Sequence, residues 1–285
     1  MSSSIKIIDC PRDAMQGLSQ YIPAEVKAIY LNKLLQVGFD TLDFGSFVSP
    51  KAIPQMRDTA EVLAMLDLSE TETQLLAIVA NERGAADACQ FDEIDYLGYP
   101  FSISETFQQR NTNRSIEDSL ALVENLQNLC EIHGKELVVY LSMAFGNPYG
   151  DLWDTALISH WIDRLQEIDV RIISLSDTIG IATPKLIGNV LGNILPDFND
   201  LEMGLHLHTN LDNWRPKMEI AYKYGAKRFD GAIKGFGGCP MAKDELIGNM
   251  PTEKIIAFLE EKNVPLNINK EILQECEKFA AQIMS

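Results

Sequence analysis

The strongest constraint on the fold is a strict alternation of short apolar, strand-like runs with longer amphipathic segments along almost the whole chain. Such alternation is typical of a parallel sheet, because parallel strands need a helical crossover between them. The expected strands cover residues 5–9, 41–44, 75–79, 93–97, 137–142, 171–175, 203–208 and 228–233. Eight strand-then-helix units predict an α/β protein with a closed (β/α)8 fold, a TIM barrel. A doubly wound open sheet is the alternative.

The amphipathic segments carry helix start and stop signals. Ser115 is an N-cap residue for a long helix that Gly134 ends. The expected helices cover about residues 23–37, 56–66, 85–90, 115–133, 153–168, a segment starting at 184, 213–224, 252–261 and 270–284. We therefore expect residues 1–285 to form a single barrel domain, with additional C-terminal helices at about 252–285.

The charge balance limits the kinds of partner. Lys and Arg number 24 against 41 Asp and Glu, which gives a net charge of −17. A nucleic-acid-binding protein usually has a basic surface, so we expect no nucleic acid partner. An anionic substrate would have to meet a local group of cations. Candidates in or after the loops of the expected rim, which are otherwise simply solvated, are Lys51, Arg57, Arg110 and Arg114.

The cysteine count and the hydropathy pattern indicate the compartment. Five scattered cysteines, with no CxxC pair, indicate neither a disulfide framework nor a zinc site. The N-terminus lacks the apolar core of a signal peptide, and no apolar run approaches eighteen residues. We expect a reduced, cytoplasmic protein with no membrane partner.

Ionisable and other polar residues gather where the expected strands end, which is where barrel enzymes carry their catalytic groups. Along the chain these candidates are Arg12 and Asp13, Asp43, Asp177, His206 and His208, Lys234, Cys239 and Asn249. The carboxyl ends of all strands meet at one rim of a barrel, so these side chains are expected to share one site.

The tripeptide HLH at residues 206–208 is the most informative of these features. Residues two apart in a strand point to the same face, so the two imidazoles should converge while Leu207 turns toward the helices. With Asp13 expected at the end of a nearby strand, the group resembles a metal site. Imidazole together with carboxylate or amide oxygens suits Mn²⁺ or Mg²⁺. The alternative is a pair of structural histidines that line the barrel.

The loop GFGGCPM at residues 235–241 follows the last expected strand. Its glycines allow tight and mobile backbone geometry, so it could close over a site and bring the Cys239 thiol to a substrate. The alternative is a structural turn with a chance cysteine. Glycine-rich dinucleotide and GxSxG motifs are absent from the sequence, which weakens dehydrogenase and esterase interpretations.

Five motifs in order resemble the 3-hydroxy-3-methylglutaryl-CoA lyases, within the pyruvate-carboxyltransferase-like superfamily, over nearly the whole chain. The motifs are PRDAMQG at 11–17, SFVSPKAIPQM at 46–56, SDTIG at 176–180, HLH at 206–208 and GFGGCPMA at 235–242. Three positions differ from the usual pattern of that family. Asp43 stands in place of Glu, Ile8 in place of an acidic residue, and Thr209 in place of Asp.

The resemblance implies roles for the candidate residues. A divalent cation, Mg²⁺ or Mn²⁺, would be held by Asp13, His206, His208 and Asn249. Arg12 would be the catalytic arginine and Cys239 the thiol of a mobile loop. Asp177 would be an acid near the substrate, with Asp43 at the position of the family's Glu. The partners implied are an acyl-CoA substrate and further copies of the chain, with a dimer favoured.

The implied reaction is cleavage of 3-hydroxy-3-methylglutaryl-CoA to acetyl-CoA and acetoacetate. Asp43 or Asp177 would take the hydroxyl proton, Arg12 would meet the charge of the thioester enolate, and Cys239 would protonate the enolate carbon. One alternative is a condensing synthase of the same superfamily that joins acetyl-CoA to a 2-oxo acid. It is disfavoured by the GGCP motif and by a chain that ends soon after the barrel. A non-catalytic barrel that binds a metal or an acyl-CoA is the other alternative.

Overall fold

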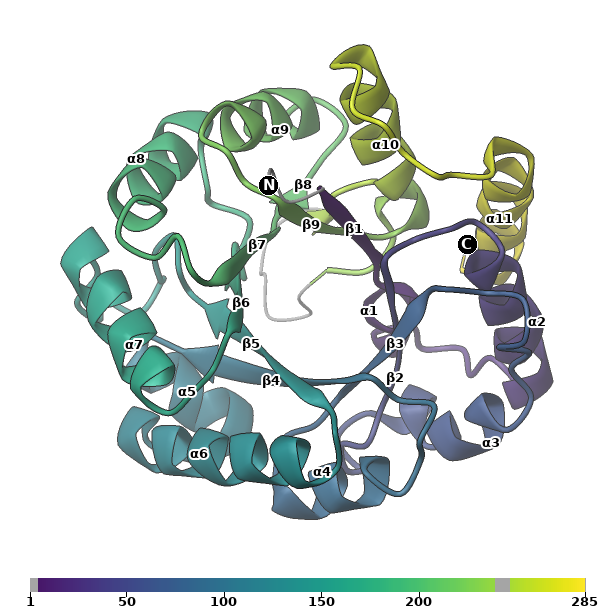
Figure 1. The fold of residues 1–285 in the computed structure, drawn as a ribbon, viewed down its shortest axis with the longest axis horizontal. Helices are drawn as coiled ribbons and strands as arrows, with labels where there is room; N and C mark the ends of the chain where they lie inside the picture. Colours follow the sequence, from purple (N-terminus) through teal and green to yellow (C-terminus); the bar gives the residue numbers. More distant parts are fainter. Residues whose placement is uncertain (1–4, 239–246, 285) are drawn as a thin grey trace.

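The computed structural model describes residues 5–238 and 247–284 and confirms the predicted TIM barrel. In this part of the chain, eight parallel strands close in the order β1-β2-β3-β4-β5-β6-β7-β9 (Figure 1). Their bounds are β1 Lys6–Asp9, β2 Thr41–Ser46, β3 Gln74–Ile78, β4 Tyr96–Ser102, β5 Glu136–Ser142, β6 Ile172–Ser176, β7 Glu202–His206 and β9 Arg228–Gly231. A separate antiparallel pair joins β8 (His208–Thr209) to β10 (Gly248–Asn249).

The helices form a ring around the strands (Figure 1). Their bounds are α1 Pro11–Gln16, α2 Ala24–Leu35, α3 Thr59–Leu63, α4 Glu82–Ala88, α5 Glu105–Thr112, α6 Ile116–Ile132, α7 Thr155–Glu167, α8 Pro184–Ile194, α9 Trp214–Lys223, α10 Thr252–Glu261 and α11 Lys270–Ile283, with 3-10 turns at Pro54–Met56 and Ile233–Gly235. The predicted cap of α6 is confirmed, since the Ser115 hydroxyl accepts a hydrogen bond from the Asp118 amide. After β9 the chain runs through α10, beside α9, to α11, which packs against α2.

Two helices, α1 and α5, are not predicted by the sequence pattern. Helix α1 has only six residues and begins with a proline. In α5, Phe107 is the single large apolar side chain, so no apolar stripe marks it as a helix. The Ser104 hydroxyl caps its first turn by accepting a hydrogen bond from the Phe107 amide.

The predicted position of the fourth strand is wrong: the strand begins at Tyr96, three residues after the expected start, and continues through Pro100 to Ser102. A proline inside a strand normally argues against pairing because it lacks an amide proton. Here β3 pairs with β4 only as far as Gly98, and β5 alone continues to Ser102. Pro100 therefore costs no hydrogen bond on the side of β3.

The barrel interior is apolar on one side and polar on the other. Side chains of β3 to β6 form a buried apolar cluster of Leu76, Ile78, Tyr96, Val138, Tyr140 and Ile172. The other side holds buried polar groups, among them Asp43, Arg228 and Asp230. The remaining core lies between the strands and the helix ring. Among the described helices, none is long and apolar enough to cross a membrane.

Candidate active site and metal-ligand cluster

Arg12 and Asp13 lie on α1 and not at the end of β1, which corrects the sequence prediction. Pro11 starts this short helix directly after β1, and both side chains are buried. The helix also carries Gln16, whose Nε2 donates to Asp13 Oδ1 at 2.6 Å and whose Oε1 accepts from Arg12 Nη1 at 2.9 Å. The spacing of a helical turn thus makes α1 a rigid holder for the carboxylate of Asp13.

The two histidines converge as predicted, but not on one strand. Strand β7 ends at His206, and His208 belongs to β8, where it pairs with Asn249 of β10. The chain leaves the barrel at Leu207, whose carbonyl accepts a hydrogen bond from the Met250 amide. The imidazole centroids nevertheless lie 5.4 Å apart, and Leu207 packs into the core outside the barrel.

Asp13, His206 and His208 offer ligand atoms that all lie within 4.8 Å of one another. Asn249 adjoins this cluster, since its Nδ2 donates to Asp13 Oδ2 at 2.7 Å. The pairing of β8 with β10 brings it there, and the Thr209 hydroxyl donates to the Asn249 carbonyl at 3.2 Å. The four predicted metal ligands therefore meet at one place, where three of them are buried and His206 is partly buried.

The electrostatics of this cluster fit a divalent cation. Burial, with His206 nearby, lowers the pKa of His208 to about 4, so its imidazole is neutral and can act as a ligand. Burial opposes ionisation of Asp13, but Arg12 and the histidines outweigh it and lower the pKa of that carboxyl. Burial also lowers the pKa of His206, but the Asp230 and Asp13 carboxylates outweigh this effect and raise it. A bound cation would take the place of the proton that the Asp13 and Asp230 carboxylates favour on His206.

A second group of possible ligands shares His206 and adds Cys10 and Asp230. Burial and several nearby carboxylates raise the pKa of the Cys10 thiol well above its usual range. A protonated thiol is a poor metal ligand. The group with Asp13 and His208 is therefore the better metal site.

Arg12 is bound on two sides by carboxylates. Its Nε and Nη2 donate to Asp43 Oδ1 and Oδ2 at 3.1 and 2.5 Å, and its Nη1 donates to Asp13 Oδ1 at 3.1 Å. A guanidinium has five N–H groups, and the described contacts, with the one to Gln16, account for four. Burial raises the pKa of Asp43 to about 6, although the charge of Arg12 opposes the shift.

Asp177 is held by Lys217, a residue that the sequence pattern does not single out. Lys217 Nζ donates to Asp177 Oδ2 at 3.0 Å and to the His208 carbonyl at 2.6 Å. Both side chains are buried. Lys217 stands on the apolar face of α9, one position before Met218 and four before Ala221. The sequence did contain a signal for this residue, because a lysine within the apolar stripe of a helix is unusual unless it is paired.

One of the three positions that differ from the lyase pattern, Ile8, lies on β1. Ile8 is fully buried and stands opposite Asp230 in the ladder between β1 and β9. Asp9, the next residue of the strand, points the other way, and its Oδ1 accepts from the Thr252 hydroxyl at 2.5 Å. Burial raises the pKa of Asp9 to about 8. Asp9 therefore belongs to the helix layer and not to the site.

A cavity of about 400 Å³ opens over the cluster. Arg12, Asp13, His206 and His208 all line it. Apolar side chains cover its other walls, including Ile53, Ile78 and Phe107. The side chains of Asp43 and Asp177 do not belong to its described lining; Asp43 contacts Arg12, and Asp177 contacts Lys217. Cys239, the remaining candidate, lies outside the described residues.

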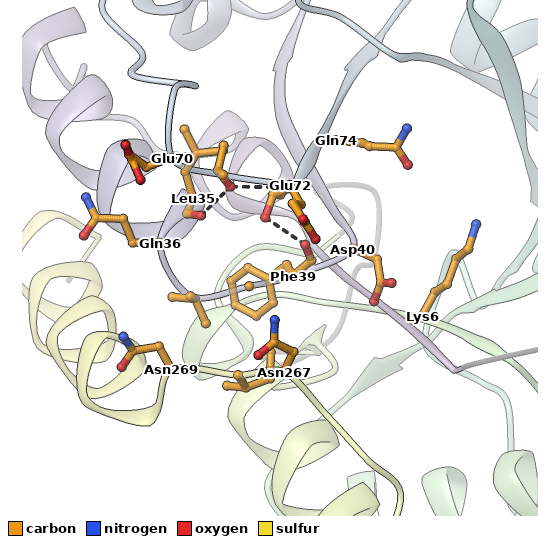
Figure 2. A pocket seen from close by; sticks show the side chains of 15 residues that line it. Lys6, Leu35, Gln36, Phe39, Asp40, Glu70, Glu72, Gln74, Asn267 and Asn269 are labelled. Atoms are coloured by element: carbon orange, nitrogen blue, oxygen red, sulfur yellow. Dashed lines mark hydrogen bonds between the residues drawn. The ribbon is translucent and has the colours of Figure 1, made fainter.

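A larger cavity of about 800 Å³ lies at the opposite end of the barrel, near the starts of β1 and β3 (Figure 2). Polar side chains such as Lys6, Asp40 and Glu72 surround it. Its loops are tied internally: the Thr71 hydroxyl donates to the Leu35 carbonyl, and the Thr73 hydroxyl to the Phe39 carbonyl. In TIM barrels this end stabilises the fold, and the chemistry occurs at the other.

Comparison with known proteins agrees with this geometry. The HMGL-like family model matches residues 4–279. The hydroxymethylglutaryl-CoA lyase YngG of Bacillus subtilis is 32% identical over 96% of this chain and 91% of its own length. A cytoplasmic 3-hydroxy-3-methylglutaryl-CoA lyase of Danio rerio is 30% identical over 99% of this chain and 83% of its own.

Solved structures give the same result. The crystal structure of the Bacillus subtilis HMG-CoA lyase superposes with a TM-score of 0.93 at 30% identity, and covers 99% of this chain and 94% of its own. An HMG-CoA lyase of Acinetobacter baumannii, solved with coenzyme A and 3-methylmalate, has a TM-score of 0.87 at 26% identity, over 100% of this chain and 92% of its own. With a family model, a sequence and a barrel structure that all match, the chain belongs to the HMGL-like family of enzymes.

Proposed function

We propose that the protein cleaves 3-hydroxy-3-methylglutaryl-CoA to acetyl-CoA and acetoacetate. The observation that carries this proposal is the cluster of Asp13, His206 and His208, which lies beside Arg12 and lines one cavity. The named relatives, which are lyases of this substrate, support it. Retro-Claisen cleavage needs a site that acidifies a tertiary hydroxyl and stabilises an enolate, and this cavity offers groups for both.

The family is metal-dependent, and we propose Mg²⁺ or Mn²⁺ as the cation. Asp13, His206, His208 and Asn249 would hold it, because their oxygen and nitrogen donors suit these ions. Bound there, a divalent cation supplies Lewis acidity that makes the substrate hydroxyl easier to ionise. The side chains of the protein then carry the remaining steps.

Arg12 is the proposed stabiliser of the enolate oxygen. It lines the cavity, and one of its N–H groups remains beyond its four described hydrogen bonds. Asp43 and Asp13 fix the guanidinium plane, so that little reorganisation is needed as charge develops. Negative charge moves onto the thioester oxygen when the carbon–carbon bond breaks, and a fixed cation favours that state over the neutral ground state.

Asp43 is the proposed general base. Its carboxyl, whose pKa burial raises to about 6, is ionised near neutral pH and still basic enough to take a proton. Asp43 does not belong to the described lining of the cavity, and the Arg12 guanidinium that binds both its oxygens cannot relay a proton. The proposal therefore requires the Arg12–Asp43 pair to open when the substrate binds, so that the carboxylate reaches the hydroxyl directly or through one water. Asp177 lies farther away, behind Lys217 and the His208 carbonyl, which favours a supporting role. We propose Cys239 as the thiol that protonates the enolate carbon, on the sequence motif alone.

The rim of the cavity suits an acyl-CoA. Asn111 and Thr112 at the end of α5 line it, directly after Arg110, and Ala52 lines it directly after the exposed Lys51. These cations can meet the phosphates of coenzyme A against the acidic background. We further propose that the barrel and its C-terminal helices act as one domain, that the protein is a homodimer, and that it is cytoplasmic. The four described cysteines are free and buried, as expected in a reducing compartment.

The test is an assay of purified protein, supplied with Mg²⁺ or Mn²⁺, against a panel of 3-hydroxy-3-methyl acyl-CoA thioesters. We expect release of acetyl-CoA and acetoacetate from the hydroxymethylglutaryl thioester. Consumption of acetyl-CoA with a 2-oxo acid, without cleavage of the thioesters, would replace the lyase by a condensing synthase. Cation binding without turnover of any thioester would indicate a binding protein.

A further inference from the structure

Below the metal-ligand cluster, a column of charged side chains runs through the barrel. Lys6 Nζ donates to Glu202 Oε2 at 2.6 Å, and Arg228 Nη1 donates to Glu202 Oε1 at 2.8 Å. Arg228 Nε lies 3.8 Å from Asp230 Oδ1, and Asp230 Oδ2 lies 3.4 Å from His206 Nδ1. The charges alternate in sign from one end of the barrel to the metal-ligand cluster at the other.

The interior is shaped to hold this column. Arg228 and Asp230 are both buried, and they lie on the polar side of the barrel. A Cβ at position 204 would lie 2.8 Å from Arg228 Cδ, so Gly204 leaves the space that the arginine stem occupies. The Ser174 hydroxyl donates to Asp230 Oδ2 at 3.1 Å. Asp230, which lies on β9, is thus also held by a hydrogen bond from β6.

His206 Nδ1 is buried and has no hydrogen-bond partner among the described residues, and the Asp230 carboxylate is the acceptor that faces it. A neutral imidazole carries its proton on one nitrogen only, and a facing carboxylate selects Nδ1. The lone pair then resides on Nε2, where it can bind a metal. In known metal sites such outer carboxylates fix the tautomer and the ring orientation of a ligating histidine.

We infer that Asp230 is a positioning residue for His206, and that Arg228, anchored by Glu202, holds Asp230 in place from the far end of the barrel. This inference rests on the proposed role of His206 as a metal ligand. Asp230 does not belong to the described lining of the substrate cavity, so it acts through the histidine and not on the substrate.

The test compares two buried carboxylates on neighbouring strands. Asp230→Asn keeps the size of the side chain but removes its charge, and should weaken Mn²⁺ binding to the metal-free protein roughly 10- to 100-fold, measured by titration calorimetry. Asp9→Asn is the matched control, because Asp9 faces the helix layer. It should leave the Mn²⁺ affinity within about twofold of the parent. Equal affinities in Asp230→Asn and the parent overturn the inference, as do equal losses in both variants.

A milder variant covers the case in which Asp230→Asn fails to fold. Ser174→Ala removes one hydrogen bond to Asp230 and leaves every charge in place. It should weaken Mn²⁺ binding roughly two- to tenfold, the worth of one hydrogen bond. An affinity equal to the parent's in a folded Ser174→Ala protein counts against the inference.

The tautomer of His206 separates this inference from the proposed function. Nitrogen-15 NMR of the metal-free protein should show the proton on Nδ1 in the parent and a mixture in Asp230→Asn. A proton on Nε2 in the parent overturns the positioning role. If the parent binds no Mn²⁺, the proposed metal-dependent function fails, and the tautomer measurement still decides whether Asp230 orients His206.

Discussion

Asp43 lies behind Arg12, held by two hydrogen bonds from the guanidinium to its two carboxylate oxygens. Arg12 reaches the cavity and Asp43 does not belong to its described lining. One buried ion pair therefore joins the group proposed to stabilise negative charge with the group proposed to accept a proton. A substitution of either residue should change the position and charge environment of the other. The effects of the two substitutions on kcat/KM should therefore not be additive.

Activity should fall at acid pH with the titration of Asp43. The pKa of this carboxyl is raised from 3.8 to about 6, and the ionised form is the proposed base. The activity is therefore present above about pH 6 and lost as the pH falls through that value. The measurement is kcat/KM for the thioester from pH 5 to 8. In Asp43→Glu, kcat/KM should still fall at acid pH, but with a different apparent pKa. In Asp177→Asn, this apparent pKa should be the same as in the parent. If the apparent pKa does not change in Asp43→Glu, the decrease at acid pH belongs to another group.

Arg12→Gln should lower kcat roughly 100- to 1000-fold, as loss of one oxyanion-stabilising donor does. The physical reason is that the guanidinium meets more negative charge in the enolate-like transition state than in the neutral thioester. Steady-state kinetics provides the measurement, and Mn²⁺ titration and circular dichroism check that the site and the fold survive. An increase confined to KM would show that Arg12 only binds the substrate.

Removal of divalent cations should abolish cleavage, and Mg²⁺ or Mn²⁺ should restore it. His206→Ala removes one ligand and should weaken Mn²⁺ binding by at least about 10-fold. This is the smallest loss usually seen when only the hydrogen-bond partner of a ligand is changed. His160→Ala is the matched control, because His160 lies on α7 against Trp161 and not in the cluster. Full turnover in a protein shown to be metal-free would contradict the proposal.

Lys217→Met should destabilise the protein by about 3–5 kcal/mol, because it leaves the buried Asp177 carboxylate without its partner. It also removes the hydrogen bond to the His208 carbonyl, so Mn²⁺ affinity should fall as well. Urea unfolding gives the stability. The double variant Lys217→Met with Asp177→Leu removes both charges and should recover most of the stability without recovering the Mn²⁺ affinity. Additive losses in the double variant would show that the two residues are independent.

The stability of the protein should depend on Asp9 between about pH 4 and pH 8. The folded-state pKa of Asp9 is raised to about 8, above the unfolded value near 3.8, mainly by burial. The folded state then binds more protons than the unfolded state in this window, so the free energy of unfolding falls as the pH rises. Asp9→Asn keeps a partner for the Thr252 hydroxyl and should flatten this slope. Urea midpoints at pH 5, 6, 7 and 8 provide the comparison, and identical slopes in both proteins would refute the assignment.

The fold of this protein could be predicted from local patterns. Eight strand-and-helix units, the Ser115 cap and the exact bounds of α10 are all recorded in residues close together in the sequence. Eight such units also fit an open, doubly wound sheet, and the closed barrel leaves no strand edge unpaired. The same patterns missed α1 and α5, whose few apolar side chains give no periodic signal.

The candidate residues were also identifiable from the sequence, but the contacts that each one makes were not. The position of Asp13 beside Asn249 depends on a contact that spans 236 residues, and on the short pairing of β8 with β10. Only the packed barrel decides that Asp43 lies behind Arg12, that Asp177 is engaged by Lys217, and that Asp230 faces His206. Periodicity fixes which face of an element a side chain takes, because it reflects local backbone geometry. The neighbours a side chain meets depend on how distant elements pack, and no local pattern records that.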